Sequence, residues 1–515
     1  MSDSPNLLIL MADQLTARAL KIYGGAVART PHIDALARSG VVFENCYCNS
    51  PLCAPSRYSF LAGQLPSSIG AYDNAAEFAA QVPTFAHYLR YAGYQTSLCG
   101  KMHFCGPDQL HGFEERLTTD IYPSDFGWTP DWTRFQQRPT WYHSMDSVLQ
   151  AGACIRSNQI DFDDEVVNAA RRKLFDLARG ADRRPFCLLV SMTHPHDPYV
   201  IADNYWSRYC DDEIDLPRVP DLAAREDPHS RRLRHVIGLS LAQPDESQVR
   251  AARRAYYGAL SYVDDQIGAL VSTLREAALD ANTVVVILAD HGDMLGERGL
   301  WYKMSFFEPA CRIPLIVHAP GRYPAHRVSA LTSLVDLLPT FAALANPAAA
   351  PRYAAPIEGR NLAPELEAGA GAGAGAAAEP RHAEVIGEYL AEGAIAPIVM
   401  IRRKSYKFVH SPADPDQLYD LLADPDELVN LAAQTDRAAL LAEFRAEVAA
   451  RWRLDSLHEA VLASQQRRHL VYAALRRGHY SAWDFQPHRD ASRLYIRNEQ
   501  DLNDLEIMAR FPRLA

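Results

Sequence analysis

Short, continuously apolar runs alternate along the chain with longer stretches in which apolar residues recur at helical spacing. Four runs have the length of buried strands, and we expect them to lie in one parallel sheet: residues 6–12, 186–192, 283–289 and 313–318. Helical spacing is clearest over residues 165–179 and 248–278. Because strands and helices alternate, the pattern predicts an α/β fold in which helices cover both faces of a large, mostly parallel sheet.

A change of composition divides the chain near residue 367. Residues 367–378 are essentially a Gly-Ala repeat, which has too little side chain to pack a core, and we interpret them as a flexible linker. We therefore expect residues 1–366 to form one large α/β domain that carries the catalytic residues described below.

Beyond this linker, shorter elements predict a small α+β domain over residues 379–480. Its expected strands and helices are residues 385–389, 398–402, 406–410, 438–453 and 458–476. Residues 481–515 are rich in aromatic and charged side chains but weakly periodic. We interpret them as an extended arm that makes an oligomer contact.

Bulk properties narrow the classes of function. The 515 residues carry a formal net charge of −11, which argues against a nucleic acid-binding surface. The apolar stretch near the start is too short for a signal-peptide core, and no run approaches the length of a membrane span. Nine cysteines are scattered without the dense spacing of a disulfide scaffold. We therefore expect a cytoplasmic protein without a membrane partner.

Polar residues gather where the apolar runs end. Asp13 and Gln14 follow the first run, and Asp290 and His291 follow the third. Since the carboxyl ends of parallel strands meet at one edge of a sheet, these four side chains would form a cage suited to a hard divalent cation. A single Asp at a strand end is more often a helix cap or a loop residue, so it is the joint pattern that favours a metal site.

A cysteine stands at the start of another predicted helix. Pro55, which is favoured in a first helical turn, lies between Cys53 and Arg57. The free N–H groups and the dipole of such a helix would attract an anion beside the thiol. For an isolated cysteine, a buried structural role is the ordinary interpretation. Here that interpretation would also have to explain the presence of Arg57 and of the paired acids.

Together these residues resemble the sulfatase family of the alkaline phosphatase superfamily. Cys53-Ala54-Pro55-Ser56-Arg57 matches the Cys-x-Pro-x-Arg signature that a formylglycine-generating enzyme oxidises in that family. The segments around Asp13, residues 100–101 and residues 290–292 follow in the family's order. The likeness covers nearly all of residues 1–340.

A closer resemblance, to choline sulfatases, extends to the end of the chain. It rests on residues 52–57, 72–77, 106–117 and 125–130. Gln14 replaces an Asp and His291 an Asn that many arylsulfatases have, departures shared with choline sulfatases and phosphonate monoester hydrolases. The resemblance implies one divalent metal ion, with calcium the first expectation and manganese or magnesium left open.

The resemblance also implies a mechanism. Cys53 would become formylglycine (3-oxoalanine), whose hydrate attacks the sulfur of a sulfate ester and afterwards expels sulfate as the hemiacetal collapses. Arg57 would orient this hydrate, and His103 would assist its deprotonation or collapse. The further contacts that the family implies for the sulfate are Lys101, Lys303 and His196, with His194 as the weaker choice for the last position.

For the substrate, the resemblance implies a site for a trimethylammonium group. Such a group cannot donate hydrogen bonds, so proteins recognise it with aromatic faces and a nearby carboxylate. The arm of a neighbouring subunit closes the pocket in choline sulfatases, which implies a homo-oligomer, a dimer or a tetramer. The implied substrate contacts are Asn74, Trp128, His143, Glu392, Asp501 and Asn503.

The implied function is hydrolysis of choline-O-sulfate to choline and inorganic sulfate, by a sulfuric ester hydrolase that a formylglycine-generating enzyme matures. Two alternatives stay open at this point. One is a phosphonate monoester or phosphodiester hydrolase on the same scaffold, with nearly the same metal and nucleophile. The other is a binding protein in which Cys53 is never oxidised.

Overall fold

The computed structural model describes most of the chain. The described residues are 4–122, 125–139, 143–221, 226–319, 321–346, 352–368 and 384–478. Of the expected linker, residues 369–378 lie outside these ranges, and the expected arm at 481–515 lies wholly outside them. The division into domains therefore stays a prediction.

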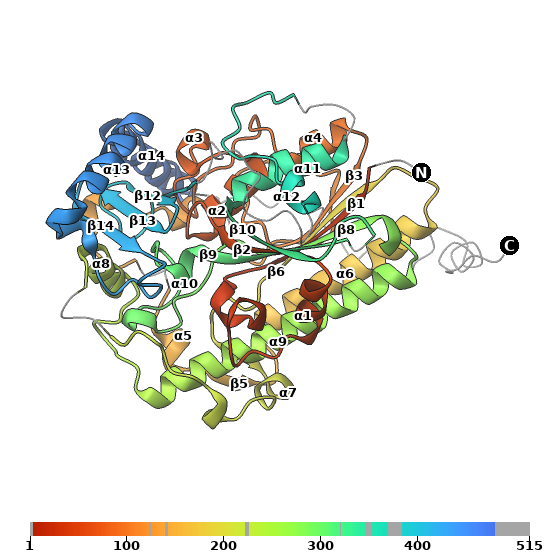
Figure 1. Ribbon diagram of the computed structural model, residues 1–515, viewed down its shortest axis with the longest axis horizontal. Coiled ribbons are helices and arrows are strands. Elements are labelled where there is room, and N and C mark those ends of the chain that lie inside the picture. The colour runs from red at the N-terminus through yellow and green to blue at the C-terminus, as the bar shows by residue number, and fades with distance from the viewer. Residues whose placement is uncertain are drawn as a thin grey trace.

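An eight-stranded sheet forms the centre of the molecule (Figure 1), with the strand order β10-β2-β9-β8-β1-β6-β3-β4. Its middle strands β1 (Asn6–Ala12), β6 (Phe186–Met192) and β8 (Thr283–Ala289) are parallel and almost wholly buried, as continuous apolar runs predict. The other strands are β2 (Val41–Tyr47), β3 (Gln95–Gly100), β4 (Glu115–Arg116), β9 (Arg312–His318) and β10 (His326–Ser333). The predicted fold class is confirmed.

The expectation of parallel pairing was wrong for β9, which runs antiparallel to both β8 and β2. A parallel neighbour needs a crossover, usually a helix, that returns the chain to the opposite edge of the sheet. Between β8 and β9 the longest helix is the single turn α10 (Glu308–Cys311), so the chain turns back at the edge where β8 ends. The apolar pattern of a buried strand does not depend on the direction of the strand in the sheet. The sequence therefore could not show that β9 is antiparallel to its neighbours.

Helices cover both faces of the sheet (Figure 1). On one face lie α1 (Pro31–Arg38), α6 (Asn158–Arg179) and α9 (Glu246–Glu276), and on the other lie α2 (Cys53–Ala62), α4 (Phe85–Tyr91) and α11 (Leu337–Ala345). The helices predicted at 165–179 and 248–278 correspond to α6 and α9. Asp245 caps α9 by accepting from Gln248 N, which explains where that helix begins.

A second, four-stranded antiparallel sheet follows, with its own apolar core against α13 (Ala438–Arg451). Its strands are β11 (Glu384–Tyr389), β12 (Ile398–Arg403), β13 (Tyr406–Ser411) and β14 (Asp414–Asp420). The first three were predicted. The last was missed because its sequence begins Asp-Pro-Asp and lacks an apolar run. After α13, helix α14 (Leu454–Leu475) reaches back to the first sheet's loops.

The remaining short elements lie in the connections. They are α3 (Pro66–Ile69), α5 (Asp146–Leu149), β5 (Gly152–Cys154), β7 (Val200–Ala202), α7 (Asp203–Trp206), α8 (Pro228–Val236) and α12 (Ala363–Glu367). Within the described part of the chain, every helix is either too short or too polar to cross a membrane.

Candidate active site

The site lies where β1, β3, β6 and β8 end. β1 pairs in parallel with β6 and β8 through to its last residue, and β3 pairs with β6 in the same way. The residues that follow these strands are therefore neighbours at one edge of the sheet. Asp13, Lys101 and Asp290 all arrive there, and each is fully buried.

Unusual backbone conformations aim these residues into the site. Gly100 has φ +97°, and a Cβ there would lie 2.0 Å from the Ser191 carbonyl oxygen, so only glycine fits before Lys101. Gln14, His103 and Met304 also have positive φ, at 63°, 62° and 70°. Strained residues of this kind concentrate at functional sites, because the surrounding packing must hold them in place.

Cys53 is the first residue of α2, at the positive end of the helix dipole. Its Sγ lies 3.2 Å from His291 Nε2 and 3.8 Å from Lys101 Nζ. The next residue, Ala54, donates its backbone N–H to Asn74 Oδ1 at 2.9 Å. The predicted nucleophile therefore stands among cationic groups at a helix N-terminus, as the sequence indicated.

Arg57, one turn further along α2, is completely buried and joins the two acids. Its Nη2 donates to Asp13 Oδ2 at 3.0 Å, and its Nε donates to Asp290 Oδ2 at 2.9 Å. Its Nη1 donates to the Lys101 carbonyl at 2.6 Å and to Ser191 Oγ at 2.8 Å. Because these four acceptors lie in or directly after four different strands, they hold the guanidinium in one orientation.

The acids form a group that fits a divalent cation. Ligand atoms of Asp13, Cys53, Asp290 and His291 all lie within 4.8 Å of one another, and all four residues are buried. Asp13 Oδ1 has no hydrogen-bond partner among the described residues. An orphaned carboxylate oxygen in a buried, oxygen-rich group is the donor chemistry that hard cations take.

Gln14, the fourth expected ligand, lies beside this group. Its backbone N–H donates to Asp290 Oδ1 at 3.0 Å. Its side-chain Oε1 accepts from Lys303 Nζ at 2.6 Å, and its Nε2 donates to Asp293 Oδ2 at 2.7 Å. The side-chain oxygen thus faces the ammonium of Lys303.

Charge at the site shifts several pKa values. Burial raises the pKa of the Cys53 thiol, but Lys101, Lys303 and His291 outweigh burial and hold that pKa well below its ordinary range. Burial likewise raises the pKa of Asp13, but Lys101, His196 and Arg57 together outweigh burial, so that pKa is lowered. The site therefore favours negative charge on both the nucleophile position and the acid.

Lys303 and His196 meet beside the metal group. Lys303 Nζ lies 2.7 Å from His196 Nε2, whose ring also has Nδ1 2.7 Å from the Asp197 carbonyl oxygen. His194, the alternative for this position, is turned away and bonds Asp163 Oδ2 at 2.6 Å through Nδ1. Of the two histidines, the structure brings only His196 to Lys303.

Sequence reasoning missed some members of this network. Asp197 accepts from His143 Nδ1 at 3.0 Å, and Asp293 accepts from Tyr199 and Gln14. Both acids belong to polar segments that directly follow predicted strands. The pattern that pointed to Asp13 and Asp290 could therefore have pointed to them as well. Tyr122, whose ring lies 4.4 Å from Lys101 Nζ, has no such signal because it follows no predicted strand.

Aromatic rings and a buried acid also lie near the nucleophile. The Trp128 ring lies 5.5 Å from that of His103 and 5.8 Å from that of Tyr122. His143 stacks on Tyr302 at 4.5 Å. The expected arm contacts Asp501 and Asn503 lie outside the described residues.

Glu392, from the loop after β11, is this buried acid. It is 2% exposed, and neither carboxylate oxygen has a hydrogen-bond partner among the described residues. Burial, with the neighbouring Asp73 carboxylate, raises the pKa of Glu392 to about 8. A buried carboxyl without a partner is costly, and a cationic ligand would compensate it.

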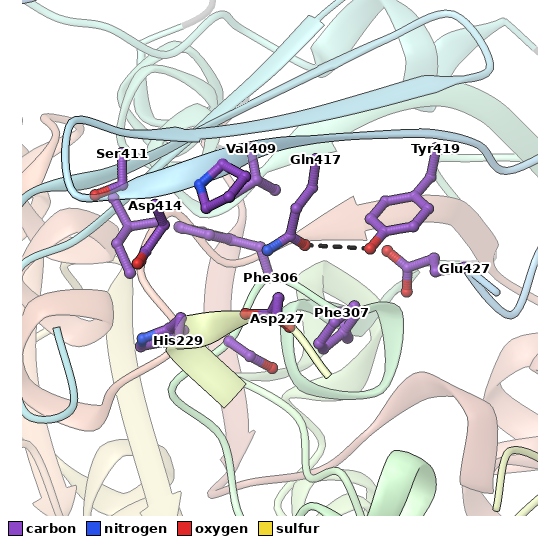
Figure 2. Close-up of a pocket in the computed structure, with 13 residues that line it drawn as sticks. Asp227, His229, Phe306, Phe307, Val409, Ser411, Asp414, Gln417, Tyr419 and Glu427 are labelled. Carbon is purple, nitrogen blue, oxygen red and sulfur yellow. Dashed lines mark hydrogen bonds between the residues drawn. The ribbon is translucent and has the colours of Figure 1, made fainter. Parts of the chain in front are cut away.

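Behind the site, a small cavity separates the second sheet from the loop that follows Lys303 (Figure 2). Its volume of about 20 Å³ holds roughly one water molecule, too little for a substrate. His229 lines it, with Nε2 2.7 Å from the Met304 carbonyl oxygen and Nδ1 3.2 Å from that of Gly393. The cavity therefore lies where the loop after Lys303 packs against the second sheet.

Comparison with protein families agrees with this geometry. Residues 5–347 match the model of the sulfatase family. The chain belongs to the sulfatase family. In this sulfatase, residues 459–511 also match the model described as choline sulfatase enzyme C terminal, and residues 296–453 that of the N-sulphoglucosamine sulphohydrolase C-terminal region.

Individual relatives cover the chain to different extents. The sulfatase is 46% identical to a choline-sulfatase of Rhizobium meliloti (strain 1021) over 99% of each chain. It is 29% identical to the iduronate 2-sulfatase of Mus musculus, over 71% of this chain and 74% of that one. Among solved structures, the phosphonate monoester hydrolase of Agrobacterium radiobacter is 22% identical with a TM-score of 0.68, covering 88% of this chain and 96% of that one. At that identity the likeness shows the fold alone.

Proposed function

We propose that this sulfatase hydrolyses choline-O-sulfate to choline and inorganic sulfate. The observation that carries the proposal is the polarity of the site. Lys101, Lys303 and the start of α2 gather around Cys53, which suits a sulfate group. Near them lies the buried carboxyl of Glu392, which has no hydrogen-bond partner among the described residues and suits a cation. The full-length likeness to a choline-sulfatase supports the same substrate.

In the proposed reaction, Cys53 acts after conversion to formylglycine, which supplies an aldehyde hydrate as a nucleophile that can later release sulfate by itself. Arg57, held by both acids, keeps the first turn of α2 in place beside that group. His103 takes a proton during attack or collapse. Lys101 and Lys303 balance the charge that develops on the sulfate oxygens.

In its imidazolium form, with a second proton on Nε2, His196 is proposed to give the proton that the leaving oxygen needs. Its Nε2 lies next to Lys303 Nζ, so the imidazole stands beside the group that holds sulfate. The Asp197 carbonyl accepts from Nδ1 and fixes the orientation of the ring. Choline is a poor leaving group as an alkoxide, and protonation by a positioned acid lowers that barrier.

A divalent metal is proposed in the group of buried acids. Asp13, Asp290 and His291, which group together in the structure, would hold it. Gln14 is proposed as the fourth ligand, and its side-chain oxygen would then exchange Lys303 for the ion. Calcium is preferred because carboxylate and amide oxygens outnumber nitrogen in this set, with manganese or magnesium as alternatives. Such an ion would lower the pKa of the nucleophile and neutralise sulfate oxygens.

The cationic headgroup is proposed to occupy what we call the choline end, defined as Asn74, Trp128, His143 and Glu392. The Trp128 face offers cation-π attraction, and Glu392 offers the opposite charge. Asp501 and Asn503 from a neighbouring subunit would close it. The exposed apolar side chains of Leu470, Val471 and Leu475 on α14, directly before the expected arm, support a homo-oligomer.

Substitution of the nucleophile tests the proposed function. Protein coproduced with a formylglycine-generating enzyme should hydrolyse choline-O-sulfate, and Cys53→Ala should abolish turnover while leaving calcium affinity largely intact, because it removes only the covalent step. The exposed Cys210 provides the matched control, since Cys210→Ala should keep full activity. Peptide mass should show an aldehyde in place of the Cys53 thiol. A persistent thiol in active enzyme contradicts the mechanism.

The alternative substrate class has a separate test. A phosphonate monoester or phosphodiester hydrolase would prefer those esters over choline-O-sulfate in matched kinetics. The solved structures with that activity share only the fold with this chain, whereas the choline-sulfatase relative matches it throughout. We therefore expect choline-O-sulfate to have the higher kcat/KM.

We also propose that the protein matures and acts in the cytoplasm, with a formylglycine-generating enzyme as its maturation partner. All nine cysteines lie in the described part of the chain as free thiols, and seven are buried. A reducing compartment preserves thiols in this state.

A further inference from the structure

One face of α14 packs on residues 126–132. Gln465 and Tyr472 stand two turns apart and so share that face. Gln465 Oε1 accepts from the backbone N–H of Trp132 at 3.0 Å. A Cβ at Gly127 would lie 2.8 Å from the Tyr472 hydroxyl, so the helix and this segment approach closely.

Arg468 lies between these two contacts and is 6% exposed. Its two terminal nitrogens donate to the two oxygens of Asp73 at 2.6 and 2.7 Å, a bidentate pair. Nη1 also lies 3.3 Å from Thr129 Oγ1, whose hydroxyl donates to the Phe126 carbonyl at 2.8 Å. A single guanidinium thus joins two loops that are distant in sequence.

Both loops carry choline-end residues. Asp73 precedes Asn74, and Thr129 follows Trp128. We infer that Arg468 is a positioning residue that fixes the spacing between the Asn74 and Trp128 walls of the choline end, and so tunes affinity for the cationic headgroup. This inference rests on the proposed function, because it assigns the headgroup to that end.

The buried charge of Asp73 shows why Arg468 holds this position. Asp73 is fully buried, and the guanidinium is its bidentate partner. Without Arg468 the Asp73 carboxylate would stand unpaired close to Glu392, where its charge already disfavours ionisation of that carboxyl. Loss of Arg468 would therefore loosen the walls, because the stranded Asp73 carboxylate would no longer be held to Thr129 across the site.

Apart from the hydrogen bond from Ala54 N–H to Asn74 Oδ1, the contacts that anchor the turn of the nucleophile do not involve the loops that Arg468 joins. Arg57 is held by contacts to Asp13, Asp290 and Ser191, and Ser56 Oγ donates to the Asp290 carbonyl at 2.5 Å. The first turn of α2 therefore keeps its place when α14 changes. A defect in Arg468 should appear as weaker binding of a cationic substrate, with little effect on attack at sulfur.

The test compares two substrates in the full-length, formylglycine-containing enzyme. Arg468→Met should raise KM for choline-O-sulfate about tenfold or more, while kcat/KM for p-nitrophenyl sulfate, which has no cation, should change less than about threefold. Arg467→Met makes the same chemical change at the adjacent, exposed position and should leave both substrates unaffected. Arg468→Lys keeps the positive charge but loses the bidentate pairing with Asp73. Its KM for choline-O-sulfate should lie between those of the wild type and Arg468→Met.

The outcomes are separable. An equal loss on both substrates, or an unchanged KM for choline-O-sulfate, overturns the positioning role. If Arg468→Met does not fold, the double variant Asp73→Asn/Arg468→Met, which removes both buried charges, carries the same expectation and the same refuting results. A wild-type enzyme that hydrolyses the aryl sulfate but not choline-O-sulfate would instead contradict the proposed function.

Discussion

At the scale of single residues, buried charges govern this site. Arg57 lies between Asp13 and Asp290, and all three side chains are fully buried. Removing one member of such a group is costly because it strands the charge of the others. The cost should depend on whether a cation is present to compensate the acids.

Arg57→Met should therefore destabilise the metal-free protein by about 3–5 kcal/mol. Urea unfolding in the presence of a chelator measures this loss. Saturating Ca²⁺ should reduce it, because the ion would balance the same two carboxylates. The exposed Arg183 supplies the control, and Arg183→Met should change stability little in either condition. A loss that Ca²⁺ leaves unchanged would argue against a cation between Asp13 and Asp290.

The pKa of Glu392 predicts how stability depends on pH. Its folded-state pKa of about 8 exceeds the ordinary value of 4.5, so between these pH values the folded protein holds a proton that the unfolded chain has lost. Stability of the substrate-free protein should therefore fall as pH rises from about 4.5 to above 8. Glu392→Gln should flatten this part of the profile in urea unfolding.

Choline binding should reverse the protonation of Glu392. The positive headgroup favours the ionised carboxylate, so choline should release a proton on binding near pH 7 and bind more tightly above pH 8. Calorimetric titrations in buffers of different ionisation enthalpy measure this release. Proton release that persists in Glu392→Gln would assign it to another group.

At the scale of elements, α8 contacts two loops of the site. His229, near its start, contacts the carbonyl oxygens of Met304 and Gly393, which adjoin Lys303 and Glu392. His229→Leu should lower kcat/KM by about tenfold for both choline-O-sulfate and p-nitrophenyl sulfate, because Lys303 serves the sulfate group of either. This distinguishes it from Arg468→Met, whose effect should depend on the cation.

His235 provides the control for that variant. It lies on the same helix, is exposed, and has Nε2 2.8 Å from the Gln136 carbonyl oxygen. His235→Leu should leave both rates within about twofold of the wild type. Equal effects of the two substitutions would mean that α8 acts on general stability instead of on the position of Lys303.

The strands also show which local sequence signals were sufficient to predict secondary structure. Continuous apolar runs predicted β1, β6 and β8 with their observed bounds, because the middle of a parallel sheet buries every side chain. The direction of β9 did not follow from its run, since direction depends on the connection. β14 escaped notice because its pairing with β13 comes from the backbone and not from an apolar pattern.

At the scale of the whole molecule, the last described helix packs against loops that lie early in the chain. α14 contacts the loops around Asp73 and Thr129 through Arg468. Its opposite side exposes Leu470, which is 72% accessible. An apolar residue at this position, directly before the expected arm, fits contact with a second copy of the chain.

Leu470→Asp should therefore weaken the proposed oligomer, because it places a charge in an apolar interface. Light scattering after size exclusion should show a lower mass at equal protein concentration. Leu241→Asp, at a similarly exposed leucine away from α14, should leave the mass unchanged. A monomeric wild-type protein would contradict the oligomer directly.

The sequence by itself determined the sheet's central strands and the long helices, and it pointed to the polar residues at the strand ends, because apolar periodicity and the residues at strand ends are local properties. Only the tertiary structure decided that Lys303 faces His196 and Gln14, that His194 turns to Asp163, and that Arg468 joins two loops. Those relations depend on how distant segments pack and compensate buried charge, which no local pattern encodes.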